Sequence, residues 1–402
     1  MLSFFSIWPA FILIGLALLV VSAPWFAVAD SPPSQRENRL AALDGLRGYA
    51  AFGVFAVHSA LYHFYLLSGT WEAPSRVLYS IAAAAVSLFF MITGYLFWGK
   101  LLAEPGRVDW MSLYIRRFFR IGPLYLFAIM GMLATVFIST SFQLRESLSS
   151  VTKEIWTWSQ LGIRHEQPDV NGYPFTRLIL NGVTWTLYFE WRFYFALLLL
   201  GFVARLKVLH IVAPATILII GLAAARFFPP APIGKAYAIY VSLFGFGMIA
   251  ASLEMRCLSL SKFGRLNDVL LVALSGGYFI FGGFGYTPVS TIILGMVFFL
   301  IVSGANPFGI LTWRPSRRLG DMSFSIYLLQ GLAMTALFAV PAARRIALAS
   351  PAGHWAMIAV CTIILLVLSR LTYVYIERPG MDLGRRIARG MGRRFKLATA
   401  AT

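Results

Sequence analysis

The sequence has little charge and almost no cysteine. Only 12% of its 402 residues are Asp, Glu, Lys or Arg, about half the share that covers a soluble domain. The two cysteines, Cys257 and Cys361, stand outside any metal or redox spacing. A disulfide framework and a zinc site are therefore excluded. The sequence also lacks segments of about ten residues with alternating polar and apolar side chains, which excludes transmembrane strands.

Long apolar runs fill most of the chain. Hydrophobic residues make up 59% of the sequence, and the mean hydropathy is +0.75. The runs are close to twenty residues long, the length of a helix that crosses about 30 Å of hydrocarbon. We therefore predict an all-α, polytopic integral membrane bundle of about eleven transmembrane helices. The spans are expected at 7–29, 46–66, 77–98, 121–140, 183–204, 210–227, 237–255, 267–284, 288–305, 323–341 and 355–376.

The net charge of +18 is interpreted as a topology signal. If the N-terminus lies outside, most of the 34 Lys and Arg residues fall on inner segments, as the positive-inside rule requires. We therefore expect a multi-pass protein of the plasma membrane, with its C-terminus in the cytoplasm. Membrane lipids are its expected partners, and nucleic acid is not.

Three units are predicted along the chain. Residues 1–40 form an extra N-terminal transmembrane helix and a linker, 41–380 form the main membrane domain, and 381–402 form a basic cytoplasmic tail. The tail is expected to contact anionic lipid headgroups. The first helix is predicted to be retained, because no positive residue precedes it and Arg36 and Arg39 follow it.

Ionisable residues at membrane depth are costly, so each one is a functional candidate. His58 falls near the middle of the second span, and Arg47 lies eleven positions earlier at its inner end. Eleven residues are close to three helical turns, which places both side chains on one face about 17 Å apart. Asp44, one turn before Arg47, can pair with it. The alternative is that Arg47 is a topology anchor and His58 a packing residue.

Glu190 is the second candidate. Its predicted depth below the outer surface, about 10 Å, is close to that of His58, about 12 Å. A buried carboxylate needs a partner, which His58 or Arg192 could provide, although Arg192 points away from Glu190 on the same helix. A third candidate is the cluster of Arg116, Arg117 and Arg120 at the inner end of the fourth span. Guanidinium groups suit phosphate, but such a cluster can also be a topology anchor.

Six short segments resemble, in order, the motifs of the acyltransferase-3 family of membrane acyltransferases. Two of them have Thr93 and Thr186 where the family usually has serine. Gln330 stands where many members carry a histidine, so proton transfer by that residue is not expected. The segments are Leu43 to Gly48 with His58 following Arg47 after ten residues, Ser87 to Tyr95, Arg117 to Arg120 with Pro123, Trp185 to Tyr194, Leu319 to Leu328, and Tyr375 to Pro379.

The resemblance implies a ten-helix core and transfer of an acyl group, usually acetyl, from a cytoplasmic thioester to a hydroxyl on the outer side. Acetyl-CoA is then the expected co-substrate, a sugar or polysaccharide the expected acceptor, and no metal is required. The pantetheine arm would run along the stripe from Arg47 to His58. The competing interpretations are a proton-coupled transporter or flippase, with His58 and Glu190 as a relay, and a non-catalytic scaffold.

The resemblance and the charge pattern together assign roles to ten residues. His58 is the expected catalytic base or acyl carrier, Glu190 orients it, and Arg47 completes the catalytic set. The expected substrate-binding residues are Asp44, Arg116, Arg117, Arg120, Trp185, Tyr188 and Tyr327.

Overall fold

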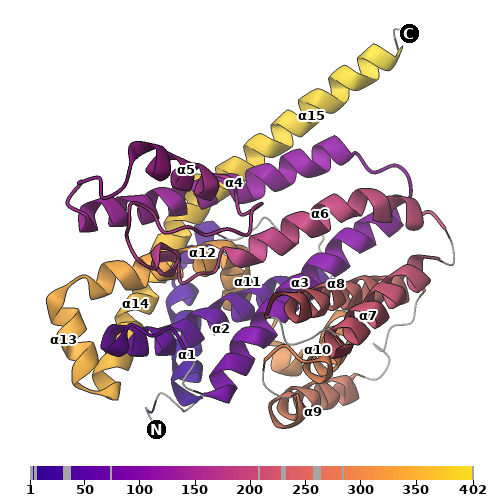
Figure 1. Ribbon diagram of the computed structural model, residues 1–402. Helices are drawn as coiled ribbons and strands as arrows, with labels where there is room; N and C mark the ends of the chain where they lie inside the picture. Colours follow the sequence, from indigo (N-terminus) through magenta and orange to yellow (C-terminus); the bar gives the residue numbers. More distant parts are fainter. Residues whose placement is uncertain are drawn as a thin grey trace.

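The computed structural model describes residues 3, 7–29, 38–72, 75–206, 209–227, 232–256, 264–282 and 285–400, and these form a helical bundle (Figure 1). Cys257 and Arg36 lie outside the described residues. The helices are α1 (Trp8–Ser22), α2 (Asn38–Ser68), α3 (Arg76–Ala103), α4 (Trp110–Ser139), α5 (Leu148–Ser159), α6 (Trp185–Val203), α7 (Leu209–Phe227), α8 (Pro232–Met255), α9 (Arg265–Phe281), α10 (Pro288–Val302), α11 (Arg314–Asp321), α12 (Ser323–Phe338), α13 (Pro341–Ala349), α14 (Pro351–Thr372) and α15 (Arg378–Ala400), with short turns η1 (Pro24–Ala29), η2 (Thr176–Leu180), η4 (Pro307–Gly309) and η5 (Tyr373–Glu377).

The all-helical prediction is confirmed for the described residues, which contain no strand. Seven helices among them are long and apolar enough to cross a membrane, and the bent pair α11 and α12 makes eight if it is one span. The two helices of this pair meet at 68°, so the span predicted at 323–341 is part of a broken element. Helices α1 and α10 are apolar but shorter. The count of about eleven stays a prediction.

Helices α2, α3 and α8 form the centre of the bundle, where glycines allow backbones to touch. A Cβ added at Gly247 of α8 would lie 2.0 Å from the carbonyl oxygen of Met91 in α3. A Cβ at Gly320 of α11 would lie 1.9 Å from the carbonyl oxygen of Asp44 in α2. Such small-residue contacts replace the hydrophobic effect, which lipid does not supply between helices. They fix the position of α2, which carries Arg47 and His58.

The extra N-terminal segment is hydrogen-bonded to α11 and α14 by two buried arginines, Arg318 and Arg370. The guanidinium of Arg318 donates to the carbonyls of Val21, 2.7 Å, and of Ser22 and Ala23, both 3.3 Å. These carbonyls lie at the end of α1 and have no partner within the helix. Arg370 in α14 donates to the carbonyl of Trp25 at 2.8 Å and stacks on its ring at 3.6 Å.

The segment between α4 and α6 packs beside α4 through α5 and η2 (Figure 1). Helix α5 runs beside α4, and the hydroxyl of Tyr125 donates to the carbonyl of Trp158 at 2.8 Å. The side chain of Asn171 connects the segment that leads to α6 with the segment that follows α4. Its Oδ1 accepts a hydrogen bond from the amide of Arg145 at 2.8 Å. Helix α6 begins after this segment, and its first residue, Trp185, packs against Phe90 in the middle of α3.

Candidate active site

A cavity of about 240 Å³, here called the basic cavity, lies between α2, α3, α4, α6 and α12. It brings together Arg47, Arg117, Arg120, Glu190 and Tyr327, half of the ten residues assigned from the sequence. Its other walls are largely apolar, formed by Val86, Phe89, Phe90, Thr93, Leu96, Ile121, Thr186, Leu187, Tyr194, Ser323 and Phe324. A cavity that combines guanidinium groups with apolar walls suits a ligand with an anionic head and an apolar arm.

The three arginines of the basic cavity have different partners. Arg47 pairs with Asp44 at 3.5 Å, as the spacing predicts. Arg120 forms an ion pair with the buried Glu377, and Glu377 also accepts from the hydroxyl of Ser325 at 2.9 Å. Arg117 lies over the ring of Phe97, 4.4 Å from its centroid. Within the described residues no carboxylate lies within salt-bridge distance of Arg117, so it is the arginine best able to bind an added anion.

Arg116 is exposed and lies outside the basic cavity. Adjacent positions on a helix point about 100° apart, whereas positions three apart share a face. Arg117 and Arg120 therefore enter the cavity together and Arg116 does not. The partner of Arg120, Glu377, was not recognised from the sequence as a charge partner. It stands in the π-helical turn η5, and a lone buried acid at the end of the last span is the signal that could have revealed it.

His58 is half-buried in α2 and contacts α12 through Gln330. The ring nitrogen Nδ1 lies 3.2 Å from Oε1 of Gln330, and Nε2 of Gln330 donates to the carbonyl of Tyr327 at 2.8 Å. Because the amide nitrogen of Gln330 donates to the carbonyl of Tyr327, the amide oxygen faces the imidazole and accepts a hydrogen bond from Nδ1–H of His58. Neutral His58 then carries hydrogen on Nδ1 and a lone pair on Nε2. The ring of Trp71 lies beside it, 5.5 Å between centroids.

In the described part of the chain, Glu190 and His58 have different hydrogen-bond partners. Glu190 accepts a hydrogen bond from the hydroxyl of Tyr194 at 2.9 Å and lines the basic cavity with Arg47. Arg47 is eleven residues, about 17 Å, from His58 along α2. The equal depth expected for the two groups assumed that α6 starts at the membrane surface. It starts against the middle of α3 instead, so Glu190 lies deeper than its position in the predicted span implied, and Gln330 takes its place beside His58.

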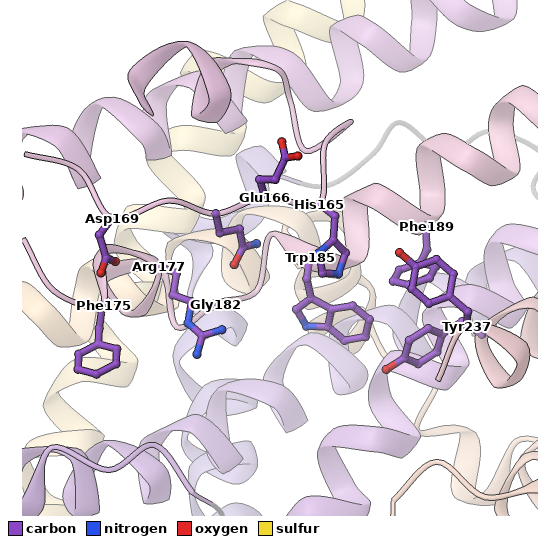
Figure 2. Close-up of a pocket in the computed structure, with 11 residues that line it drawn as sticks. His165, Glu166, Asp169, Phe175, Arg177, Gly182, Trp185, Phe189 and Tyr237 are labelled. Atoms are coloured by element: carbon purple, nitrogen blue, oxygen red, sulfur yellow. The ribbon is translucent and has the colours of Figure 1, made fainter. Parts of the chain in front are cut away.

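A second cavity of about 640 Å³, here called the aromatic cavity, opens where α6 and α8 begin. Figure 2 shows Trp185, Phe189 and Tyr237 toward one side, and Asp169, Phe175 and Arg177 toward the other. Trp185, one of the expected substrate-binding residues, lines this cavity. Tyr188 does not line the cavity but packs behind His165, 5.1 Å between ring centroids. The remaining lining residues are His165, Glu166, Gln167, Gly182 and Tyr240.

An aromatic partition separates the two cavities. Phe90 lines the basic cavity, and its ring centroid lies 5.6 Å from that of Tyr240 and 6.4 Å from that of Trp185, which line the aromatic cavity. Helix α6 contributes residues to both cavities, because Trp185 lines the aromatic cavity and Glu190 lines the basic cavity. The partition thus has the ring of Phe90 on one side and the rings of Trp185 and Tyr240 on the other, and His58 lies outside the lining of both cavities.

The chain matches the family model of the acyltransferase domain of the acyltransferase-3 family. The match covers residues 40–373, from the start of α2 to the beginning of η5. No curated protein and no solved structure matches the chain. The match spans most of the chain and contains both cavities, and its helices are those of a multi-pass membrane protein. The chain belongs to the acyltransferase-3 family, whose general activity is acyl transfer.

Proposed function

We propose that this protein transfers an acetyl group from acetyl-CoA, bound in the basic cavity on the cytoplasmic side, to a sugar hydroxyl in the aromatic cavity on the outer side. The observation that carries the proposal is the connection from His58 through Gln330 to the backbone carbonyl of Tyr327, a residue that lines the basic cavity. This connection links an imidazole with a free lone pair to the wall of the cavity that would hold the donor.

The basic cavity suits the donor on two counts. Arg117 and Arg47 offer planar guanidinium groups, which bind phosphate in two-pronged fashion. Val86, Phe89 and Tyr327 form part of the apolar wall of this cavity, and in the proposal the pantetheine arm runs past them to His58. The rise of about 17 Å from Arg47 to His58 is of the length that a pantetheine arm spans. The positive-inside rule places this arginine-rich end in the cytoplasm, where acetyl-CoA is found.

In the proposed step, Nε2 of His58 removes the proton of the acceptor hydroxyl, and the oxygen attacks the thioester carbonyl. The tetrahedral adduct then expels the CoA thiolate, which takes the proton back from the imidazolium. Gln330 holds the ring with Nδ1 protonated and stabilises the imidazolium. Since Phe89 and Tyr327 meet edge to face, with ring centroids 5.8 Å apart, the thioester has to pass this contact to reach His58.

The aromatic cavity suits a carbohydrate acceptor. Trp185, Phe189, Tyr237 and Tyr240 offer apolar ring faces, and the opposite wall offers Asp169 and Arg177 as hydrogen-bonding groups. Sugar rings have one apolar face and a rim of hydroxyls, so they match a site of this composition. Other hydroxyl-bearing acceptors of similar shape would fit the same chemistry.

The test is release of CoA thiol from acetyl-CoA by the purified protein in lipid nanodiscs, with a glycolipid extract of the host as acceptor. His58→Ala is expected to lower turnover by a factor of about 10²–10⁴, the usual contribution of a general base. His210→Gln, a buried histidine on α7, serves as the control and is expected to retain turnover. Wild-type turnover in a well-folded His58→Ala protein would exclude the mechanism.

The competing transporter model requires His58 and Glu190 to exchange protons. The separation of about 17 Å between His58 and the Arg47 end of the cavity, where Glu190 lies, does not favour a direct relay. Consumption of acetyl-CoA by purified protein distinguishes the two models, because a transporter moves its solute across sealed vesicles without consuming thioester.

A further inference from the structure

The chain reverses direction immediately after α2. Gly69 has a φ angle of +72°, a left-handed conformation that glycine adopts at little cost. Its amide donates to the carbonyl of Tyr65 at 2.9 Å, and the hydroxyl oxygens of Ser68 and Thr70 lie 2.7 Å apart across the turn. The turn directs the next residue, Trp71, back along the helix that the chain has just left.

Trp71 packs on the face of α2 that carries His58. The centroid of its ring lies 5.5 Å from that of His58, 6.2 Å from that of Tyr62 and 6.0 Å from that of Tyr65. Positions 58, 62 and 65 are spaced by four and three residues, so they form one stripe along the helix. This stripe continues the line from Arg47 to His58, and Trp71 covers its end opposite Arg47.

The indole of Trp71 rests on a fixed support. Tyr62 is buried and stacks on Phe338 of α12, with 5.2 Å between ring centroids, and its hydroxyl donates to Thr335 at 3.3 Å. Trp71 itself is half-buried. One part of its surface therefore packs on these rings, and the other part stays accessible to an arriving molecule.

A cover over His58 matters because a base that takes a proton from a sugar hydroxyl can also take one from water. The oxygen of that water would then attack the thioester carbonyl and the C–S bond would break, giving acetate and CoA thiol. Enzymes suppress such side reactions by excluding water. His58 lies outside the lining of both cavities, and in the described part of the chain Trp71 is the aromatic side chain that contacts it.

We propose that Trp71 determines whether His58 acts on water or on the acceptor. The indole shields the imidazole from water until an acceptor packs against its accessible part. Trp71 is thus a positioning residue, which acts through His58 and forms no bond to the acyl group. The proposal rests on the proposed function for the identity of the base and the thioester. The shielding itself is a property of two neighbouring rings and can be measured without turnover.

The first measurement is the rate at which diethyl pyrocarbonate modifies His58 in the full-length protein in nanodiscs, followed by mass spectrometry of peptides. Trp71→Ala is expected to raise this rate about fivefold or more, because the imidazole loses its cover, and Trp71→Phe should stay near the wild-type rate. The exposed His165 is the internal reference. Trp156→Ala, which removes a tryptophan that is 66% exposed on α5, is the matched control and should leave the rate unchanged.

The second measurement is thiol release from acetyl-CoA in the absence of acceptor. Trp71→Ala should release thiol about tenfold faster than wild type, because water now reaches the base, and acetate should form in equal amount. Adding His58→Ala to Trp71→Ala should remove this extra hydrolysis. Trp156→Ala should again behave as wild type.

An unchanged rate of His58 modification in a folded Trp71→Ala protein would overturn the proposal, because Trp71 would then serve only as an aromatic anchor at the membrane surface. Faster modification without faster hydrolysis would overturn it as well, since water would reach the ring without reacting. If wild-type protein consumes no acetyl-CoA even with acceptor present, the proposed function fails, whereas the modification rates still decide on the shielding.

Discussion

Replacing Gln330 tests how the proposed base is oriented. Gln330→Met keeps the length of this fully buried side chain and removes both the acceptor for His58 and the donor to the carbonyl of Tyr327. At 3.2 Å the bond to neutral His58 is of ordinary strength, with a net value of about 0.5–1.5 kcal/mol. When the imidazole takes up a proton the same bond becomes charge-assisted, about 1.5–3 kcal/mol.

The difference, roughly 1–1.5 kcal/mol, stabilises only the protonated state that forms during the reaction, and 1.4 kcal/mol is a factor of ten in rate. We therefore expect Gln330→Met to lower kcat about tenfold and to leave the KM for acetyl-CoA nearly unchanged. Thiol release in nanodiscs gives both constants, and Gln160→Met, at the end of α5, is the control. A kcat within twofold of wild type, or a loss confined to KM, would refute this role for Gln330.

Three further predictions concern the cavity and its supports. Arg117→Gln should raise the KM for acetyl-CoA by about tenfold or more, since it removes a charge-assisted phosphate contact, and Arg116→Gln, outside the cavity, should not. Glu377→Gln should destabilise the protein by about 1–3 kcal/mol, because the half-buried guanidinium of Arg120 loses its counter-charge; unchanged thermal unfolding in detergent would contradict the ion pair. Gly320→Ala should prevent stable folding because its Cβ would lie 1.9 Å from a backbone oxygen of α2, while Gly276→Ala, with nothing within 4 Å, should be neutral or slightly stabilising; equal melting temperatures for the two would contradict the close packing.

Much of the architecture followed from local features of the sequence. Helix type and the approximate positions of the spans depend on the length and composition of apolar runs, which are local. The pairing of Asp44 with Arg47, and the entry of Arg117 and Arg120 into one cavity, depend on helical periodicity. Such relations hold whatever the tertiary fold, so the sequence was sufficient for them.

Relations between distant segments were harder to predict. The position of Glu190 was misjudged because it depends on where α6 starts, and α6 is displaced so that it starts beside Phe90 in the middle of α3. Nothing in the local pattern of α6 reports this displacement. For the same reason Gln330 was treated as a departure from the family pattern, although its contact with His58 joins residues 272 positions apart. Glu377 was noted as part of a motif, but its partner on α4 is more than 250 positions away.

The anchoring of the first helix has a consequence for biosynthesis. The carbonyls at the end of α1 are satisfied by Arg318, some 295–297 positions later in the chain, and that of Trp25 by Arg370. During synthesis α1 leaves the ribosome first, but it cannot form these contacts until almost the whole protein has been made. Assembly therefore ends where translation began, and a protein halted before α14 would present an undocked first helix to the quality-control machinery of the membrane.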